Sequence, residues 1–252
     1  MTSAYFDLTG QVALVTGGGR GIGFSIAQGL SDCGAELVIC GRNAGVLDQA
    51  RAALGGIATT AIVDVSDESA VIALRDSIHA RFGRLDILVN NAGIDPHYAP
   101  LERTDRADWE KVLNTNLNGV FYCCKHLGGL MIPAKSGVII NISSVAGQVG
   151  LKRQIPYCAS KGGVEQLTRA LAIDWAEHGI RVNAIGYGFI KTDLTSSVLE
   201  HPHIAPKLLA RTPLGRFGEL SEVAGAAIFL ASPSASYVTG HTLMVDGGWT
   251  AA

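Results

Sequence analysis

The chain has 252 residues, of which 48% are hydrophobic, and it carries a formal net charge of −2. This length and composition suffice for a large core in one domain that spans residues 1–252. Because the charge is balanced and no long basic cluster occurs, nucleic acid and anionic membranes are excluded as expected partners. No apolar run approaches the roughly 18 residues of a membrane span.

The cysteines and the first residues predict the compartment. The five cysteines form no Cys-x-x-Cys pair and lie in apolar contexts, so we expect reduced core residues. The start of the chain lacks the basic-then-apolar pattern of a secretion signal. These observations predict a cytoplasmic protein that acts on a small molecule.

Short apolar runs of strand length alternate with longer stretches of helical period. We expect strands at 12–16, 36–40, 57–63, 85–90, 137–143, 181–185 and 242–245. We expect helices near 22–33, 44–54, 67–82, 106–131, 154–178 and 220–231. Apolar strands that alternate with helices predict a doubly wound α/β domain, a parallel sheet with helices on both faces. Ligands bind such sheets beyond the carboxyl ends of the strands.

A glycine-rich turn follows the first expected strand and opens the first expected helix. It reads Thr16-Gly17-Gly18-Gly19-Arg20-Gly21-Ile22-Gly23. Glycines let the backbone approach a pyrophosphate, and the free amides of a helix N-terminus bind its charge. A glycine run alone could be a mere turn, but its placement between a strand and a helix favours a dinucleotide site.

Arg42 follows the second expected strand, where a carboxylate would bind the ribose hydroxyls of NAD. With no acid to repel a phosphate, and with Arg42 and Arg20 to bind one, the sequence favours NADP, and NAD is the alternative. A solvated Arg42, or one stacked on adenine, is the competing interpretation. Asp64 and Val65, after the third strand, are expected beside the adenine. Asp64 could equally cap the next helix, although Ser66 or Asp67 would cap it better.

Tyr157 and Lys161 are spaced to lie one turn apart on the same face of an expected helix. An ammonium and a helix N-terminus both stabilise a phenolate, so we expect the pKa of Tyr157 to fall from about 10 toward roughly 7. Tyr157 would then exchange a proton with a substrate oxygen held by Ser144, at the end of a buried strand. The same spacing alone also fits a surface pair on an ordinary helix.

Two further polar groups follow the fourth strand. Asn90-Asn91-Ala92-Gly93 combines small residues, which permit close approach, with amides that can bridge strand ends or touch the ribose. Asn116 lies inside a long expected helix, where an asparagine is unfavourable unless its side chain has a task. We expect Asn116 to hold a kink or a water linked to Lys161.

Together these motifs resemble the short-chain dehydrogenase/reductase family over nearly the whole chain. The shared motifs are Thr16-Gly17-x-x-x-Gly21-x-Gly23, Asn90-Asn91-Ala92-Gly93, Asn116, Ser144, Tyr157-x-x-x-Lys161 and Val245-Asp246-Gly247-Gly248. The resemblance implies a Rossmann-like sheet of seven strands and hydride transfer between a nicotinamide and a carbonyl or alcohol. It also implies a homotetramer, assembled through the helices near 106–131 and 154–178 and through the C-terminal segment.

The resemblance implies roles for individual residues as well. Tyr157 would be the acid/base, Ser144 rather than Ser143 would position the substrate oxygen, Lys161 would bind the nicotinamide ribose, and Asn116 would order a relay water. The expected cofactor contacts are Gly17, Arg20, Gly21, Ile22, Gly23, Arg42, Asp64, Val65, Asn91, Ala92, Gly93, Tyr157, Lys161, Ile190 and Thr192.

One position departs from the family pattern, and the region after it is the expected lid. Tyr187 stands where the family usually has proline, so we expect its ring to narrow the pocket, stack on the substrate or loosen the loop. Residues 187–217 should form the substrate lid, with Lys207 and Arg211 as candidate anion anchors. On the opposite wall we expect the side chains of Asp95, His97 and Tyr98. His201 and His203 lack a carboxylate partner, so no metal site is predicted.

The leading functional hypothesis is an NADP(H)-dependent oxidoreductase that interconverts a secondary alcohol and a ketone. Candidate substrates are sugar acids such as gluconate, 3-oxoacyl thioesters and small apolar ketones. One alternative is an NAD-dependent member of the same family that acts on a sugar acid or a 3-oxoacyl substrate. Another is a non-catalytic dinucleotide sensor, although such a protein would typically lack the Tyr or the Lys. A nucleotide-sugar epimerase would usually need a longer C-terminal region.

Overall fold

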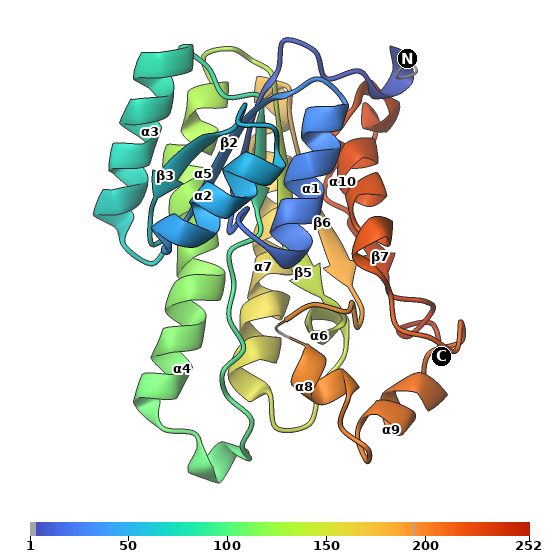
Figure 1. Cartoon of the computed structure of the whole chain (residues 1–252). Coiled ribbons are helices and arrows are strands. Elements are labelled where there is room, and N and C mark those ends of the chain that lie inside the picture. The colour runs from blue at the N-terminus through green and yellow to red at the C-terminus, as the bar shows by residue number, and fades with distance from the viewer. Residues whose placement is uncertain (1–3, 194) are drawn as a thin grey trace.

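The computed structural model describes residues 4–193 and 195–252 and contains one parallel sheet of seven strands (Figure 1). The strand order is β3-β2-β1-β4-β5-β6-β7. The strands are β1 Val12–Thr16, β2 Glu36–Gly41, β3 Thr59–Ile62, β4 Ile87–Asn90, β5 Gly137–Ser144, β6 Ile180–Tyr187 and β7 Thr242–Val245. The predicted Rossmann-like fold is confirmed. The order reverses between β1 and β4, which places a ligand crevice at the carboxyl ends of these strands.

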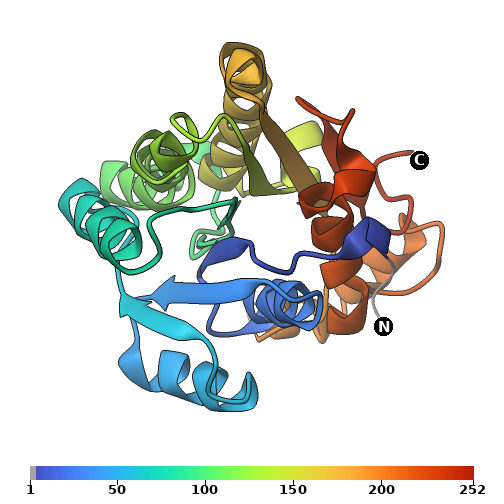
Figure 2. The same cartoon turned by 90° about the horizontal axis from the view of Figure 1, so that it is seen from above.

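Helices cover both faces of the sheet (Figure 2). They are α1 Gly21–Asp32, α2 Ala44–Ala53, α3 Glu68–Phe82, α4 Arg106–Leu113, α5 Gly119–His126, α6 Val145–Gln148, α7 Ile155–Asp174, α8 Ser196–Leu199, α9 Ala205–Ala210 and α10 Ala224–Ala231. Helices α1, α2 and α10 pack on one face, and α3, α5 and α7 pack on the other. The helices α8 and α9 lie near the carboxyl ends of the strands (Figure 1).

The two faces of the sheet build two separate core layers. In β1 every residue is buried, yet the side chains alternate between layers, as a pleated strand requires. Ala13 and Val15 pack with the α1 and α10 side, while Val12 and Leu14 pack with the α3 and α5 side. Strands buried on both faces read as continuous apolar runs, which explains why the sequence displays them clearly.

Two strands begin later than expected. The strand predicted at 57–63 begins at Thr59, because Gly55 and Gly56 adopt positive φ values of 70° and 79° and turn the chain first. Ile57 is consequently 69% exposed in this turn. The strand predicted at 85–90 begins at Ile87. Strands β5 and β6 are instead longer than expected and reach Ser144 and Tyr187.

The long helix expected at 106–131 is interrupted. Between α4 and α5 the chain makes a π-helical turn at Asn114–Asn118, and Asn116 is fully buried within it. A π-turn widens the helix and redirects a side chain, so it accommodates an asparagine that an α-helix disfavours. The helix expected to reach residue 178 ends as α7 at Asp174, and a 3-10 turn, Ala176–His178, leads to Gly179 in the left-handed conformation.

Asp67 caps α3, accepting hydrogen bonds from the backbone N–H groups of Ser69 and Ala70. The alternative interpretation of Asp64 as the cap of this helix is therefore wrong. Asp64 instead accepts hydrogen bonds from the backbone and hydroxyl of Ser66, at 3.0 Å and 2.7 Å. Within residues 4–193 and 195–252, no helix has both the length and the hydropathy to cross a membrane.

Candidate active site

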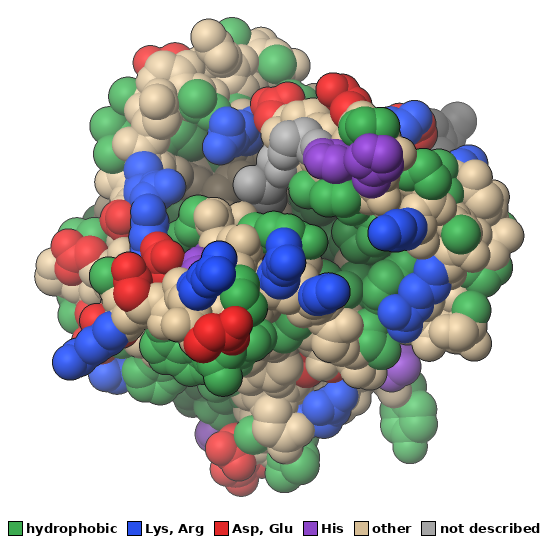
Figure 3. Space-filling model, turned by 90° about the horizontal axis from the view of Figure 1, so that it is seen from below, with side chains coloured by type: hydrophobic (Ala, Val, Ile, Leu, Met, Phe, Trp, Pro, Cys, Tyr) green, Lys and Arg blue, Asp and Glu red, His purple; other side chains and the backbone are tan. Residues whose placement is uncertain are grey.

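A cavity of about 340 Å³ lies at the carboxyl ends of the central strands. Every expected cofactor contact borders this cavity, and so does Ser144. Asn116, the remaining expected catalytic residue, is not among its lining residues. The structure therefore gathers residues from β5, from α7 and from the loops that follow β1, β2, β3, β4 and β6 around one space. Figure 3 views the molecule from the end where the lid helices lie, and Lys and Arg side chains gather on that surface.

In the glycine-rich turn, the first residues of helix α1 pack closely against the backbone at Gly17. Gly17 and Gly21 adopt φ values of 64° and 54°, which favour glycine. A Cβ at Gly23 would lie 2.3 Å from the Gly17 carbonyl oxygen, so only glycine fits there. Asn91 donates from Nδ2 to the carbonyl oxygens of Thr16 and Gly17, at 2.9 Å and 3.2 Å, and locks the turn.

The N-terminus of α1 fits a pyrophosphate. The N-cap residue Arg20 makes no side-chain cap, so the first amides of α1 have no side-chain acceptor at that position. A Cβ at Gly21 would meet only Thr192, at 3.7 Å, which leaves room beside these amides. Free amides and the positive end of the helix dipole together suit an anionic group.

Arg42 and Asp64 lie beside each other where an adenosine ribose would bind. Their closest charged atoms, Nη1 and Oδ2, are 3.9 Å apart, and both side chains are substantially exposed. Such an exposed and long pair contributes little to stability. Arg42 therefore remains available to an added anion, and it borders the same cavity as Arg20.

Tyr157 and Lys161 lie on the same face of α7, as their spacing predicts. Helix α7 begins at Ile155 with Pro156 in its first turn, where the missing N–H of proline has no cost. The Lys161 Nζ atom is 5.7 Å from the centre of the Tyr157 ring. It donates a hydrogen bond of 2.7 Å to the Ile142 carbonyl oxygen, and the side chain is 5% exposed.

The expected lowering of the Tyr157 pKa is wrong for this arrangement. Burial raises the pKa of Tyr157 to about 12, since the phenolate loses its hydration, although a hydrogen bond with Ser144 opposes the rise. Burial also lowers the pKa of Lys161 to about 8. With its pKa raised to about 12, the Tyr157 phenol is neutral near pH 7, the form that can donate a proton.

The adjacent hydroxyls of Ser143 and Ser144 have different partners. Ser144 hydrogen-bonds with Tyr157 and accepts from the backbone N–H of Ala146 at 3.2 Å. Ser143 donates to Glu165 Oε1 at 2.9 Å and belongs to a structural network. Glu165, only 2% exposed, was missed in the sequence. Glu165 follows Lys161 by four residues, as Lys161 follows Tyr157, so all three share one face of the helix. This spacing in the sequence indicates that Glu165 lies near the site.

Asn116 fixes the chain segment that follows β4. Its Oδ1 accepts from the Ile94 backbone N–H at 2.8 Å, and its Nδ2 donates to the Ile94 carbonyl oxygen at 2.8 Å. Asn116 thus binds both the backbone N–H and the backbone carbonyl of Ile94, as a neighbouring β-strand would. Gly93 lies within this segment, and a Cβ there would be 3.7 Å from Lys161 Nζ. Asn116 therefore positions backbone beside the buried lysine.

The expectation that the Tyr187 ring stacks on a substrate or loosens the loop is wrong. Tyr187 borders the cavity but is only 3% exposed, and its hydroxyl donates to the Val223 carbonyl oxygen at 2.7 Å. The residue ends β6 in register with Ser144 and Val245, so the strand continues through this position. The ring fills the core beneath the site rather than the substrate space.

The expected lid contains α8 and α9, and Leu194 within it lies outside the described residues. Arg211, a candidate anion anchor, places its guanidinium carbon 3.8 Å from the centre of the Trp249 ring. The rings of His201 and His203 are 6.1 Å apart. No cluster of three or more potential metal ligands occurs in the part of the chain that the structure describes.

On the opposite wall, His97 and Tyr98 do not face the cavity. His97 is buried, with Nδ1 3.0 Å from Asp108 Oδ2 and Nε2 2.8 Å from Thr104 Oγ1. Tyr98 is 58% exposed. None of Asp95, His97 and Tyr98 is among the residues that line the cavity, so the predicted wall is wrong: His97 contacts Asp108 and Thr104, and the Tyr98 ring lies beside Arg153.

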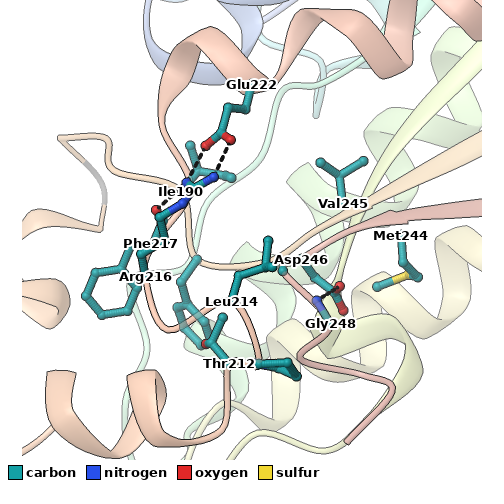
Figure 4. Close-up of a pocket in the computed structure, with 14 residues that line it drawn as sticks. Ile190, Thr212, Leu214, Arg216, Phe217, Glu222, Met244, Val245, Asp246 and Gly248 are labelled. Atoms are coloured by element: carbon teal, nitrogen blue, oxygen red, sulfur yellow. Dashed lines mark hydrogen bonds and ion pairs between the residues drawn. The ribbon is translucent and has the colours of Figure 1, made fainter.

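A second cavity, of about 440 Å³, lies beyond the end of β7 (Figure 4). Leu214, Phe217 and Met244 give it apolar surface, and Arg216 binds Glu222 through two hydrogen bonds of 2.7 Å at its edge. Ile190 borders both cavities. Neither Tyr157 nor Lys161 lines this space, so the candidate active site is the first cavity, which both residues line.

Residues 17–250 match the family model described as Enoyl-(Acyl carrier protein) reductase. The match spans the glycine turn, the Ser144, Tyr157 and Lys161 positions and the end of β7. The chain belongs to the short-chain dehydrogenase/reductase family. It is accordingly an oxidoreductase.

Named relatives within this family cover nearly the full length of the chain. It is 44% identical to the gluconate 5-dehydrogenase of Gluconobacter oxydans, over 97% of this chain and 96% of the relative. It is also 44% identical to the galactitol 2-dehydrogenase (L-tagatose-forming) of Cereibacter sphaeroides, over 97% of each chain. A solved gluconate 5-dehydrogenase from Burkholderia cenocepacia, in complex with NADP and tartrate, superposes with a TM-score of 0.95. That protein is 40% identical, over 99% of this chain and 98% of its own.

Proposed function

We propose that the protein is an NADP(H)-dependent oxidoreductase that interconverts a secondary alcohol and a ketone. The observation that carries this proposal is the single cavity that joins the glycine turn to Ser144, Tyr157 and Lys161. A sensor that only binds a dinucleotide has no need of a buried phenol hydrogen-bonded to a serine. We further propose that residues 1–252 act as one domain, with 187–217 as the substrate lid.

In this proposal Tyr157 moves the proton and Ser144 holds the substrate oxygen. During reduction, the Tyr157 hydroxyl gives its proton to the carbonyl oxygen as that oxygen gains negative charge. The Ser144 hydroxyl donates a hydrogen bond to the same oxygen and stabilises this charge. When bound, the nicotinamide supplies the hydride to the carbonyl carbon, and the reverse transfer accompanies alcohol oxidation. Lys161 would bind the ribose and, as a cation nearby, favour the phenolate left on Tyr157.

NADP is proposed over NAD because of the charges around the adenosine end of the cavity. Arg42 and Arg20 border it, and a guanidinium binds a phosphate through paired hydrogen bonds. The Burkholderia cenocepacia structure named above contains NADP, which supports the same choice. Asp64 also borders the cavity, and its Oδ2 atom lies 3.9 Å from Nη1 of Arg42.

The proposed substrate is a sugar acid or a polyol. The two relatives reported above are named for gluconate and galactitol, and both compounds are polyhydroxylated.

The proposed assembly is a homotetramer. It is supported by apolar side chains exposed on α5 and α7, Phe121 at 45% and Ile173 at 78%. The five cysteines are unpaired, as expected in a reducing cytoplasm.

The proposal is tested by following the absorbance of NADPH and NADH with purified protein. A panel of ketones, polyols and sugar acids is offered with each cofactor. Turnover that prefers NADPH and disappears in Tyr157→Phe is the expected result. Cofactor binding without turnover of any member of the panel would favour the sensor instead.

A further inference from the structure

Asp95 and Gln154 form a polar pair beside the reacting groups. Asp95 lies on the segment that leads from β4 to α4, and Gln154 is the N-cap residue of α7, three positions before Tyr157. The Gln154 side-chain amide donates a hydrogen bond to Asp95 Oδ2. The pair therefore bridges the two chain segments that flank Tyr157.

The second oxygen of this carboxyl group lacks a donor. Asp95 Oδ1 is shielded from solvent and has no hydrogen-bond partner in the described part of the chain. Neither Lys161 nor His97 supplies one: Lys161 donates to the Ile142 carbonyl oxygen, and the His97 nitrogens contact Asp108 and Thr104. A carboxylate oxygen removed from water without a donor is costly, so it is a strong acceptor for any incoming hydroxyl.

The carboxyl group lies close enough to the catalytic groups to affect their charges. Its negative charge raises the pKa of both Tyr157 and Lys161. The preceding residue, Ile94, lines the cavity, and Asn116 fixes its backbone. Asp95 itself is not among the residues that line the cavity, and it follows Ile94 on the Tyr157 and Lys161 side, away from Arg42 and Asp64.

We propose that Asp95, oriented by Gln154, is a specificity-determining residue that accepts a hydrogen bond from a hydroxyl on the carbon next to the reacting carbon. The inference rests on the proposed function and narrows its substrates to vicinal diols and α-hydroxy ketones. Polyols and sugar acids carry such a hydroxyl. In a 3-oxoacyl thioester, the two carbons next to the reacting carbonyl are methylene groups. A simple ketone likewise has no hydroxyl on the carbons next to its carbonyl. Gln154 binds Oδ2, which leaves Oδ1 as the acceptor for the substrate hydroxyl.

Ketone pairs that differ by this one hydroxyl test the inference. The full-length protein is assayed with acetoin and 2-butanone, and with 2-hydroxycyclohexanone and cyclohexanone, using NADPH and NADH. Asp95→Leu keeps the approximate volume and removes the acceptor. Glu102→Leu is the matched control, because it removes an exposed carboxylate from the same segment. Fluorescence titration with NADPH checks that each variant still binds the cofactor.

The wild-type protein should prefer the hydroxylated member of each pair. Asp95→Leu should lower kcat/KM for that member by about 10- to 100-fold, the range for a hydrogen bond to a charged group. Its kcat/KM for the plain ketones should be retained, as should all values for Glu102→Leu. Equal losses on both members, or no loss, would overturn the role of Asp95 while the proposed function stands. A wild-type protein that reduces none of the four ketones would overturn the proposed function and this inference with it.

Discussion

The ammonium nitrogen of Lys161 lies 5.7 Å from the centre of the Tyr157 ring, yet its hydrogen bond goes to the backbone of β5. The sheet therefore fixes the position of the cation, while the helix fixes the phenol relative to it. The pKa of Lys161 is lowered to about 8 by burial, so the lysine is close to losing its charge in mildly alkaline solution.

Tyr157→Phe should reduce kcat by roughly 10²- to 10⁴-fold, the usual contribution of a positioned acid/base group. The variant removes the proton carrier but keeps the ring, so the dissociation constant for NADPH should change little. Single-turnover kinetics and NADPH fluorescence measure the two effects. Tyr122→Phe, on α5 outside the cavity, is the control. Substantial turnover by Tyr157→Phe would remove Tyr157 from the mechanism.

Arg42→Asp should shift the preference from NADPH toward NADH. The change removes a guanidinium and introduces a carboxylate that repels a phosphate and accepts hydrogen bonds from ribose hydroxyls. We expect the ratio of kcat/KM values to fall by about 10- to 100-fold, since hydrogen bonds to charged groups have this strength. Arg51→Asp, an exposed position on α2, controls for the change in net charge. An unchanged ratio would argue against Arg42 as the phosphate ligand.

Tyr187→Phe should lower the free energy of unfolding by about 1 kcal/mol, because the Val223 carbonyl oxygen loses a buried donor. The relative kcat/KM values across substrates should stay as in the wild type, since the ring packs in the core. Urea unfolding and the substrate panel measure the two quantities. A changed substrate preference with unaltered stability would show instead that the hydroxyl contributes to the substrate pocket.

Asp95→Asn should stabilise the protein above about pH 6 but not near pH 4. Burial raises the pKa of Asp95 from 3.8 to about 6, so the folded protein holds this proton more tightly than the unfolded chain. The stability that comes from this tighter proton binding is fully present below the pKa of Asp95 in the unfolded chain, 3.8. It is lost as the pH rises through the pKa of about 6 in the folded protein. Allowing for the partial exposure of the side chain, we expect a gain of about 1 to 2 kcal/mol at neutral pH.

The measurement for Asp95→Asn is thermal unfolding at both pH values. Glu102→Gln, on the exposed part of the same segment, is the matched control and should leave the melting temperature unchanged. An Asp95→Asn variant that is no more stable than the wild type at neutral pH would contradict the desolvation of this carboxyl group.

Patterns in the sequence predicted the sheet well because its strands are buried on both faces. Strands β1 and β7 begin and end at the predicted residues. For the break in the long helix at Asn114–Asn118, the sequence offers one indication, the unusual interior Asn116. Helix propensities do not locate a π-turn. The start of β3 was predicted two residues too early, because the apolar Ile57 resembles a strand residue. Ile57 instead lies exposed in the turn that follows Gly55 and Gly56.

The candidate site was predictable where spacing along one element determines geometry. Tyr157 and Lys161 share a helix face because they are four residues apart, and the strand-end positions meet because parallel strands end at one edge. The pKa of Tyr157 was not predictable, because burial depends on all the segments that surround the phenol. The contact of Asp95 with Gln154 joins positions far apart in the chain, and no local pattern signals it.

The alternation of Ser143 and Ser144 along β5 has a consequence for protein engineering. The two hydroxyls are chemically identical, and the parity of each position in the strand decides which one reaches Tyr157 and which one binds Glu165. Point substitutions preserve that parity. A single-codon insertion upstream in β5 would move Ser143 into the place of Ser144 and bring Ile142 opposite Glu165, and a deletion would bring Val145 into the place of Ser144. Libraries built on this scaffold should therefore vary the composition of β5 while keeping its length constant.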